Sequence, residues 1–184
     1  ANGYDLEVDA TGYSSLYLPY PVEIPEGVVA YCVTNVDETT AAVTLEAIGD
    51  GVIPARTGVI IETTAGTHHF NPASQSGTAT SLMVGHTEDT NADTGKSYYA
   101  FTNMNGEKQF SLLTGSLLPA HRAFLEVQSG SLPEVLSINI VETGIGQLIT
   151  PGQGPAKVYD LSGRRVKQSS GGIYIINGQK VVAE

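Results

Sequence analysis

The sequence predicts an all-β protein whose main part is an antiparallel β-sandwich of the jelly-roll or immunoglobulin-like type, followed by a small C-terminal β-appendix. Three observations support this class. Strand-like runs are many and short, turn residues separate them, and no stretch has the apolar periodicity of a three-turn helix. Val, Ile, Thr and Tyr recur in the runs, where they suit a half-buried pleated surface. Strands about 8–12 residues apart are typical of a sandwich or barrel.

Ten runs are expected to form strands. Each combines β-branched, aromatic or small apolar residues, and most lie between clusters of Gly, Pro, Asn or Asp. Their ranges are 14–18, 28–36, 42–48, 58–62, 67–70, 81–85, 97–103, 108–113, 122–127 and 135–141. Between two of them, Asn105-Gly106 predicts a tight hairpin, because both positions tolerate positive φ.

A faint internal repeat links two of these runs. VIPARTGVIIE (52–62) and LLPAHRAFLE (117–126) both begin with two apolar residues, Pro and Ala, and both end an apolar run in Glu. The proline prevents a ladder hydrogen bond where the strand begins. Two interpretations remain open: equivalent strands in two sheets, or two independent uses of one turn.

The chain divides by composition after the last of the ten runs. Residues 142–156 are rich in Gly and Pro, as linkers are, and they separate a main domain (1–141) from a small β-unit (157–184). Within that unit, the apolar runs 173–176 and 180–183 flank Asn177-Gly178, a second hairpin signal. A unit of this size is marginally stable by itself.

Charge separates the same two parts. Residues 1–150 carry four basic and seventeen acidic side chains, net −13, whereas residues 151–184 have a net charge of +3. An acidic surface repels phosphate backbones, so nucleic acid is not an expected partner. No stretch approaches the ~20 apolar residues of a transmembrane helix, so no membrane span is expected. The oligomeric state is left open.

The C-terminal unit resembles a known segment. DLSGRRV and GGIYIINGQKVV are similar to the C-terminal ends of many secreted and surface proteins of Bacteroidetes, which are related to the sorting domain of type IX secretion. The matching residues are Asp160, Leu161, Gly163, Arg164, Val166, Gly172, Tyr174 and Lys180. The resemblance implies a secreted or cell-surface protein. Because the segment is shorter than a full sorting domain, it is either an address or a structural end-cap.

The main domain resembles a β-domain of large secreted proteins of gut Bacteroidetes. The resemblance rests on YSSLYLPYPVEIPEGVVAYCV, VIPARTGVIIE and LLPAHRAFLEV. Members of this family are mostly accessory modules beside other domains, without shared catalytic residues to carry over. The resemblance therefore implies secretion and an all-β fold, and it leaves the activity open.

A calcium site is one candidate for function. Asp89, Asn91 and Asp93 place oxygen ligands at alternate positions, as the beginning of a calcium loop does. The glycine, however, comes one residue late at Gly95, and the twelfth position is Ala100 rather than Glu. A solvated hairpin loop uses the same residue types. Apart from this candidate calcium site, no cofactor is expected.

Tyrosines are the other candidate, as stacking platforms for sugar rings. Tyr17, Tyr20, Tyr98 and Tyr99 are the residues in question. Tyr98 and Tyr99 are adjacent, so in a strand one faces the core and the other is expected to be free. The alternative is that each Tyr fills a half-buried strand position with its hydroxyl in water. The absence of Trp weighs against glycan binding.

No catalytic motif is recognisable. The chain lacks the Gly-x-Ser-x-Gly elbow, a phosphate-binding loop and His-Glu-x-x-His. Its one cysteine, Cys32, lies in an apolar run and is expected to be a buried small hydrophobe. The sequence therefore predicts a non-catalytic secreted or cell-surface accessory module that binds a glycan or a surface protein. Two alternatives remain: a glycan-active enzyme with paired carboxylates, for which Glu62 and Glu126 are candidates, or a structural spacer.

Overall fold

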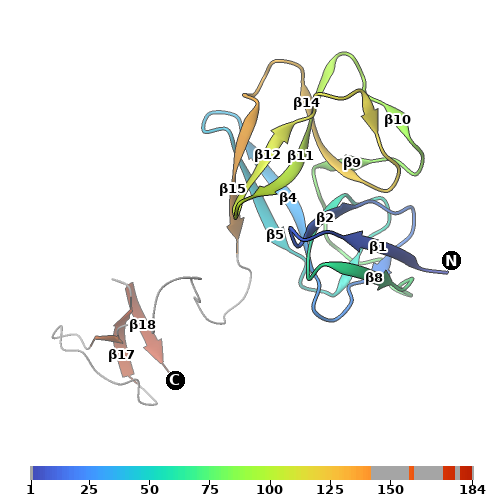
Figure 1. Ribbon diagram of the computed structural model, residues 1–184. Helices are drawn as coiled ribbons and strands as arrows, with labels where there is room; N and C mark the ends of the chain where they lie inside the picture. The colour runs from blue at the N-terminus through green and yellow to red at the C-terminus, as the bar shows by residue number, and fades with distance from the viewer. Residues whose placement is uncertain (1, 142–157, 160–171, 177–178, 184) are drawn as a thin grey trace. The chain divides into compact units, whose positions relative to one another are not determined.

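The computed structural model describes residues 2–141, 158–159, 172–176 and 179–183, and every regular element among them is a β-strand (Figure 1). The all-β prediction is therefore confirmed for the described residues. The chain divides into two compact units, Ala1–Thr143 and Gly144–Glu184. No helix in the described residues is long and apolar enough to cross a membrane.

A sheet of nine strands organises the first unit. Its order is β2-β7-β4-β5-β15-β12-β11-β14-β9. The strands are β2 (Tyr13–Leu16), β4 (Val29–Asp37), β5 (Ala42–Ala47), β7 (Val59–Glu62), β9 (Met83–Gly85), β11 (Lys96–Met104), β12 (Glu107–Leu112), β14 (Ala123–Gln128) and β15 (Val135–Val141). All ten predicted strands are present with small shifts at their ends, nine of them in this sheet.

The expectation of a purely antiparallel sheet is wrong at one pair. β15 runs antiparallel to β12 but parallel to β5, with Ser137 opposite Ala42 and Val141 opposite Glu46. The cause is geometric, because β5 and β12 run in opposite directions and a strand between them must be parallel to one. The result is a large mixed sheet, and the finer assignment to a sandwich stays a prediction.

Three two-stranded ribbons complete the unit. β1 (Tyr4–Val8) pairs with β8 (Gly66–Phe70), β3 (Val22–Glu23) with β6 (Val52–Ile53), and β10 (Thr90–Asn91) with β13 (Leu117–Leu118). Of these six strands only β8 was expected from the sequence. The predicted hairpin at Asn105-Gly106 is confirmed, since it joins β11 to β12 and both residues have positive φ, 54° and 83°.

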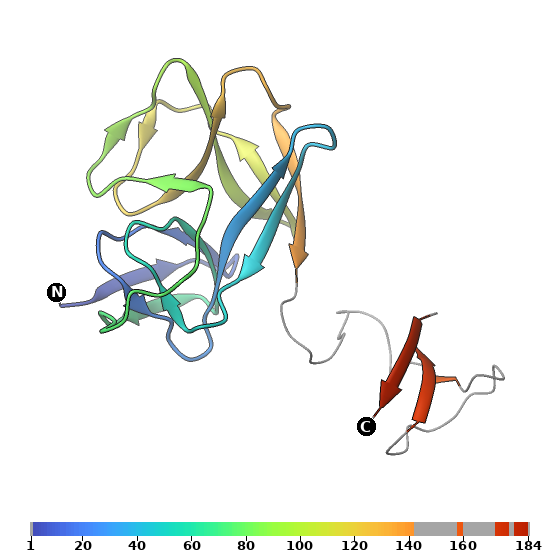
Figure 2. The ribbon, with the colours of Figure 1, turned by 180° about the vertical axis from the view of Figure 1, so that it is seen from behind.

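The first unit is an internal duplication. Strands β2 to β7, the first half (13–62), and strands β9 to β14, the second half (83–128), share one pairing pattern. In each half the first strand pairs with the sixth, the sixth with the third, the third with the fourth, and the second with the fifth. The order of the large sheet therefore reads the same from either end, with β15 in the middle (Figures 1 and 2).

The register of the strands is also duplicated. Tyr31 lies opposite Ile60 in the first half, and Tyr99 lies opposite Leu125 in the second. Before the repeated strands, Arg56 and His121 both have a positive φ, 56° and 62°. Arg56 donates its backbone N–H to the carbonyl of Leu18 (2.7 Å), and His121 donates its backbone N–H to the carbonyl of His86 (2.8 Å). Leu18 and His86 each come shortly after the first strand of their half. The two similar segments are thus equivalent strands, in one sheet rather than two.

The two halves share a hydrophobic core. One cluster of buried side chains contains Leu45 and Ile60 of the first half together with Tyr99, Phe110 and Leu125 of the second. A second cluster lies within the first half and the β1–β8 ribbon, and a small third one lies within the second half. Because the central cluster spans both halves, we expect them to unfold together.

Two glycines lie where the halves come close together. A Cβ atom on Gly85 would lie 2.4 Å from Cγ of Tyr17, and one on Gly58 would lie 2.8 Å from Cβ of Met83. Both distances are too short for carbon atoms in contact. Glycine at these positions therefore allows the backbone of each half to approach the other.

The C-terminal unit contains an antiparallel sheet of β16 (Val158–Tyr159), β17 (Gly172–Ile176) and β18 (Gln179–Ala183). The pairing of β17 with β18 agrees with the predicted hairpin. Gly172 and Tyr174 lie in β17, and Lys180 lies in β18. The remaining positions of the sorting-like motif lie outside the described residues, namely Asp160, Leu161, Gly163, Arg164 and Val166. Asn177 and Gly178 of the turn and the predicted linker (142–156) also lie outside them.

Candidate functional site

Tyr98 and Tyr99 do not form an exposed platform. Their side chains are 5% and 1% exposed, so the expectation that one ring stays free is wrong. β11 is covered on both faces, with Tyr99 in the central cluster and Tyr98 in the third cluster with Phe124. Tyr99 also donates its hydroxyl to the carbonyls of Leu132 (3.1 Å) and Pro133 (2.8 Å). Both residues therefore have a structural role.

Tyr17 and Tyr20 are half-buried. Tyr17 packs against Gly85, and Tyr20 donates its hydroxyl to the carbonyl of Gly3 at 3.1 Å. Because Tyr98 and Tyr99 are buried, the structure does not bring the four candidate tyrosines together at one open surface.

The candidate calcium ligands hold turns in place. Asp89 accepts the backbone N–H of Ala120 at 2.9 Å, and Asp93 accepts that of Gly95 at 2.9 Å. Asn91 lies in β10 opposite Leu117. In the part of the chain that the structure describes, no three or more His, Cys, Asp or Glu side chains gather as a metal site would require. Calcium binding stays a prediction.

The other reactive side chains have ordinary partners. Cys32 is 3% exposed, and burial, followed by the charge of Glu46, raises the pKa of its thiol to about 11. It is therefore a neutral buried side chain at pH 7, as predicted. Glu62 accepts the hydroxyl of Tyr31 at 2.8 Å, and Glu126 pairs with Lys96 at 2.6 Å. The two carboxylates thus belong to separate local contacts.

The larger of two pockets in the first unit has a volume of about 530 Å³, and we call it the apolar pocket. It lies between the segment that leads into β2 and the end of β11. Apolar side chains dominate its wall, and two of them are unusually exposed, Met104 at 65% and Leu117 at 50%. The wall includes Tyr13, Phe101, Met104, Leu113, Leu117 and Phe124.

A few polar groups fix the geometry of the apolar pocket. Arg122, the residue before β14, donates to the hydroxyl of Ser14 and to the carbonyl of Ser15 (3.3 Å), both in β2. Asn103 donates its amide to the carbonyl of Thr11 at 3.2 Å. Hydrogen bonds from Thr11 lower the pKa of Asp9, which is therefore a carboxylate at neutral pH.

The tyrosine in this pocket is already engaged. The ring of Tyr13 lies 5.0 Å from that of Phe101, and Nζ of Lys108 lies over it at 5.2 Å from its centre. Burial is the main reason why the pKa of Tyr13 is raised. Its contacts with Phe101 and Lys108 leave it poorly suited to stack on a sugar ring.

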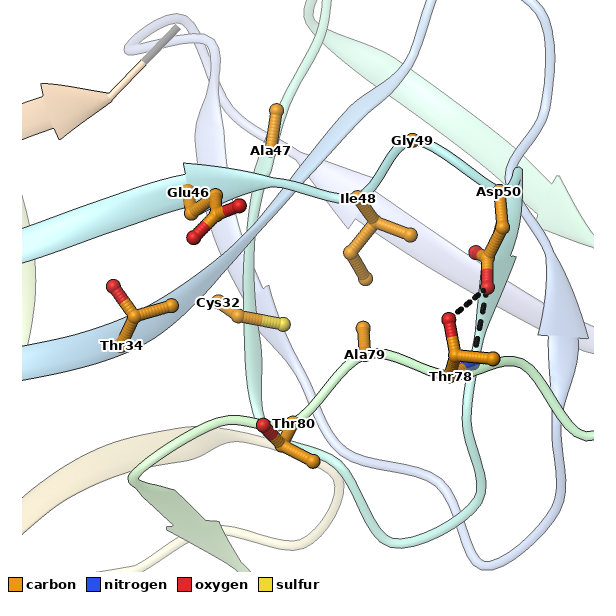
Figure 3. A pocket seen from close by; sticks show the side chains of 10 residues that line it. All are labelled: Cys32, Thr34, Glu46, Ala47, Ile48, Gly49, Asp50, Thr78, Ala79 and Thr80. Carbon is orange, nitrogen blue, oxygen red and sulfur yellow. Dashed lines mark hydrogen bonds between the residues drawn. The ribbon is translucent and has the colours of Figure 1, made fainter. Parts of the chain in front are cut away.

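The second pocket, which we call the polar pocket, has a volume of about 290 Å³ (Figure 3). Strands β4 and β5 form one side, and residues 78–80 form the other. Asp50 joins the sides, because it accepts the backbone N–H and the hydroxyl of Thr78, both at 2.9 Å. It also accepts the N–H of Val52 at 3.2 Å, and these bonds lower its pKa.

The two pockets occupy equivalent places in the two halves. In the repeat, Cys32 corresponds to Ala100 and Ile48 corresponds to Leu113. Cys32 and Ile48 line the polar pocket, whereas Ala100 and Leu113 line the apolar pocket. Each pocket is closed by residues from the opposite half: residues 78–80, which lead into β9, close the polar pocket, and residues 9–15, which lead into and begin β2, close the apolar pocket. Sequence reasoning missed both pockets, and the repeated Pro-Ala segments were the signal that could have led to them.

No protein family matches this chain, and no match was found among curated proteins or solved structures. The resemblances to secreted Bacteroidetes modules and to a sorting segment therefore stay predictions.

Proposed function

We propose that the first unit is a non-catalytic binding module of a secreted or cell-surface protein, and that its apolar pocket holds an apolar side chain of a protein partner. The observation that carries this proposal is an open pocket of about 530 Å³ with half-exposed Leu117 and Met104 at its wall. A concave apolar surface with a few convergent polar groups is the usual form of a binding site.

A protein partner suits this pocket better than a glycan. Met, Phe and Tyr are enriched at protein interfaces, and Met adapts to varied apolar partners. The candidate tyrosines offer no exposed pair of rings for sugar stacking, since Tyr98 and Tyr99 are buried. The net charge of −13 over residues 1–150 favours a partner with basic residues around its apolar anchor.

The enzyme alternative gains no support from the described residues. Glu62 and Glu126 each have a separate partner, and the thiol of Cys32 is neutral at pH 7. The proposal of secretion or surface display rests on the sorting-like tail, and a spacer role remains the alternative for a module that binds nothing.

Selection from a displayed peptide library on the full chain tests the proposal. We expect the selected peptides to carry an apolar residue flanked by Lys or Arg. Calorimetry should then show at least tenfold weaker binding to Leu117→Ser and Met104→Ser. Leu82→Ser is the matched control, because Leu82 is 53% exposed and lines neither pocket.

Equal affinity of all three variants would exclude the apolar pocket as the site. A glycan array, probed in parallel, tests the other partner class. Glycan binding that is lost in Leu117→Ser but kept in Leu82→Ser would keep the site and replace the protein partner by a glycan. Absence of binding to any peptide or glycan would favour the structural role.

A further inference from the structure

The polar pocket differs from the apolar pocket in the groups it offers to a ligand. Its wall carries the carboxylates of Glu46 and Asp50 and the hydroxyls of Thr34, Thr78 and Thr80, and it includes no Lys or Arg. Figure 3 shows these side chains on both sides of the cavity, with Cys32 and Ile48 between them. Its polar surface is therefore rich in hydrogen-bond acceptors and in negative charge.

Glu46 is the charged group in this pocket that lacks a partner among the described residues. No described residue donates a hydrogen bond to its carboxylate or pairs with it, although its side chain is half-buried beside Cys32, its neighbour across the β4–β5 ladder. Asp50, in contrast, uses both oxygens to hold Val52 and Thr78. A half-buried carboxylate without a partner is costly, and a cationic ligand would satisfy it.

We infer that the polar pocket is a second binding site and that it takes a primary ammonium group. An ammonium group offers three donors and one positive charge. Glu46 would supply the countercharge, and the hydroxyl oxygens of Thr34 and Thr80 would accept the other hydrogen bonds. The excess of acidic side chains over residues 1–150 would raise the local concentration of cations near the pocket.

The duplicated fold explains why one unit has two sites of unlike chemistry. Ser111 stands in the second half where the first half has Glu46, since Ser111 lies opposite Ala100 and Glu46 lies opposite Cys32 in the equivalent ladders. The apolar pocket has both Asp9 and Arg122 in its wall, so its negative charge is balanced, whereas that of Glu46 is not. The second site thus goes beyond the proposed partner binding, and either site stands without the other.

Two sources could supply the ammonium group: a lysine side chain of a protein or an amino sugar. Calorimetric titration of the full chain distinguishes them with two probes, a capped lysine-containing pentapeptide and a tetramer of glucosamine. The N-acetylated form of each probe is its matched control, because acetylation removes the charge and keeps the rest of the probe. We expect at least one amine probe to bind and its acetylated form to bind at least tenfold more weakly.

Glu46→Gln assigns the binding to the pocket, because it removes the charge and keeps the shape. The control is Glu38→Gln, which removes the same charge from an exposed turn position outside the pocket. We expect Glu46→Gln to weaken amine binding at least tenfold and Glu38→Gln to leave it within twofold of the unmodified protein. The inference would be overturned if Glu46→Gln and Glu38→Gln changed amine binding equally. It would also be overturned if the acetylated probes bound as tightly as the amine probes, or if no amine bound up to millimolar concentration.

Discussion

The two halves of the first unit share a backbone and differ in their side chains. Both have the same six-strand pairing, and both enter the sixth strand through a Pro-Ala turn with a left-handed residue, Arg56 or His121. Their pockets, however, present Glu46 in one half and an apolar wall with Met104 in the other. Strand pairing and core burial are therefore common to the two halves, whereas the side chains that face the pockets differ.

The halves also differ at their edges. The first half is extended by the β1–β8 ribbon, and its β4–β5 ladder has a register shift between Val33 and Asn35. The corresponding β11–β12 ladder is regular through the hairpin. The register shift begins at Val33, a buried residue of the shared central cluster, so the common core tolerates this difference.

The largest effect is expected from the shared core. Leu45 and Phe110 hold equivalent ladder positions and are 1% and 0% exposed. Phe110→Ala should lower the free energy of unfolding by about 3–5 kcal/mol and Leu45→Ala by about 2–5 kcal/mol, because each leaves a cavity. Urea denaturation followed by circular dichroism should show one transition for each variant. Two separate transitions would mean that the halves are independent folding units.

A smaller effect is expected where the halves meet. Gly85→Ala should cost about 1–3 kcal/mol, since the new methyl group would overlap the ring of Tyr17. In a Tyr17→Ala background the same substitution should cost less, because the ring is gone. A double-mutant cycle by thermal denaturation measures this coupling, and strictly additive costs would show that the two residues do not meet.

Tyr99→Phe tests the buried hydroxyl of the second half. Loss of its hydrogen bonds to the carbonyls of Leu132 and Pro133 should lower the free energy of unfolding by about 1 kcal/mol. Tyr31→Phe is the matched variant of the first half, where the hydroxyl donates to Glu62 instead. Urea denaturation checks both, and an unchanged midpoint for Tyr99→Phe would count against this buried contact.

The smallest effect is a pH dependence of the first half. The folded pKa of Asp50 is lowered from 3.8 by its hydrogen bonds to Val52 and Thr78, so its stabilising effect is present above that value and is lost as pH falls through the lowered pKa. We expect Asp50→Asn to melt below the unmodified protein at pH 7, and the two to converge as the pH falls through the lowered pKa of Asp50. A difference in Tm that persists at pH 2 would rule out the carboxylate as its cause.

The sequence predicted the long strands well, because apolar and β-branched runs between turn residues are a local signal. β1 was missed although Leu6 and Val8 alternate with polar residues, and the other missed strands have only two residues, too few for any periodicity. The burial of Tyr98 could not be predicted, because it depends on the third cluster covering a face that an isolated sheet would expose. Both pockets join segments far apart in the chain, which no local pattern reveals.

The most direct test of the proposed binding module is to map where a selected peptide contacts the full chain. Backbone amide resonances would be followed by NMR as the peptide is added. We expect shifts at 9–15, 100–104 and 113–124, around Met104 and Leu117. Shifts spread over the surface, or confined to other strands, would contradict the assignment of the apolar pocket as the binding site.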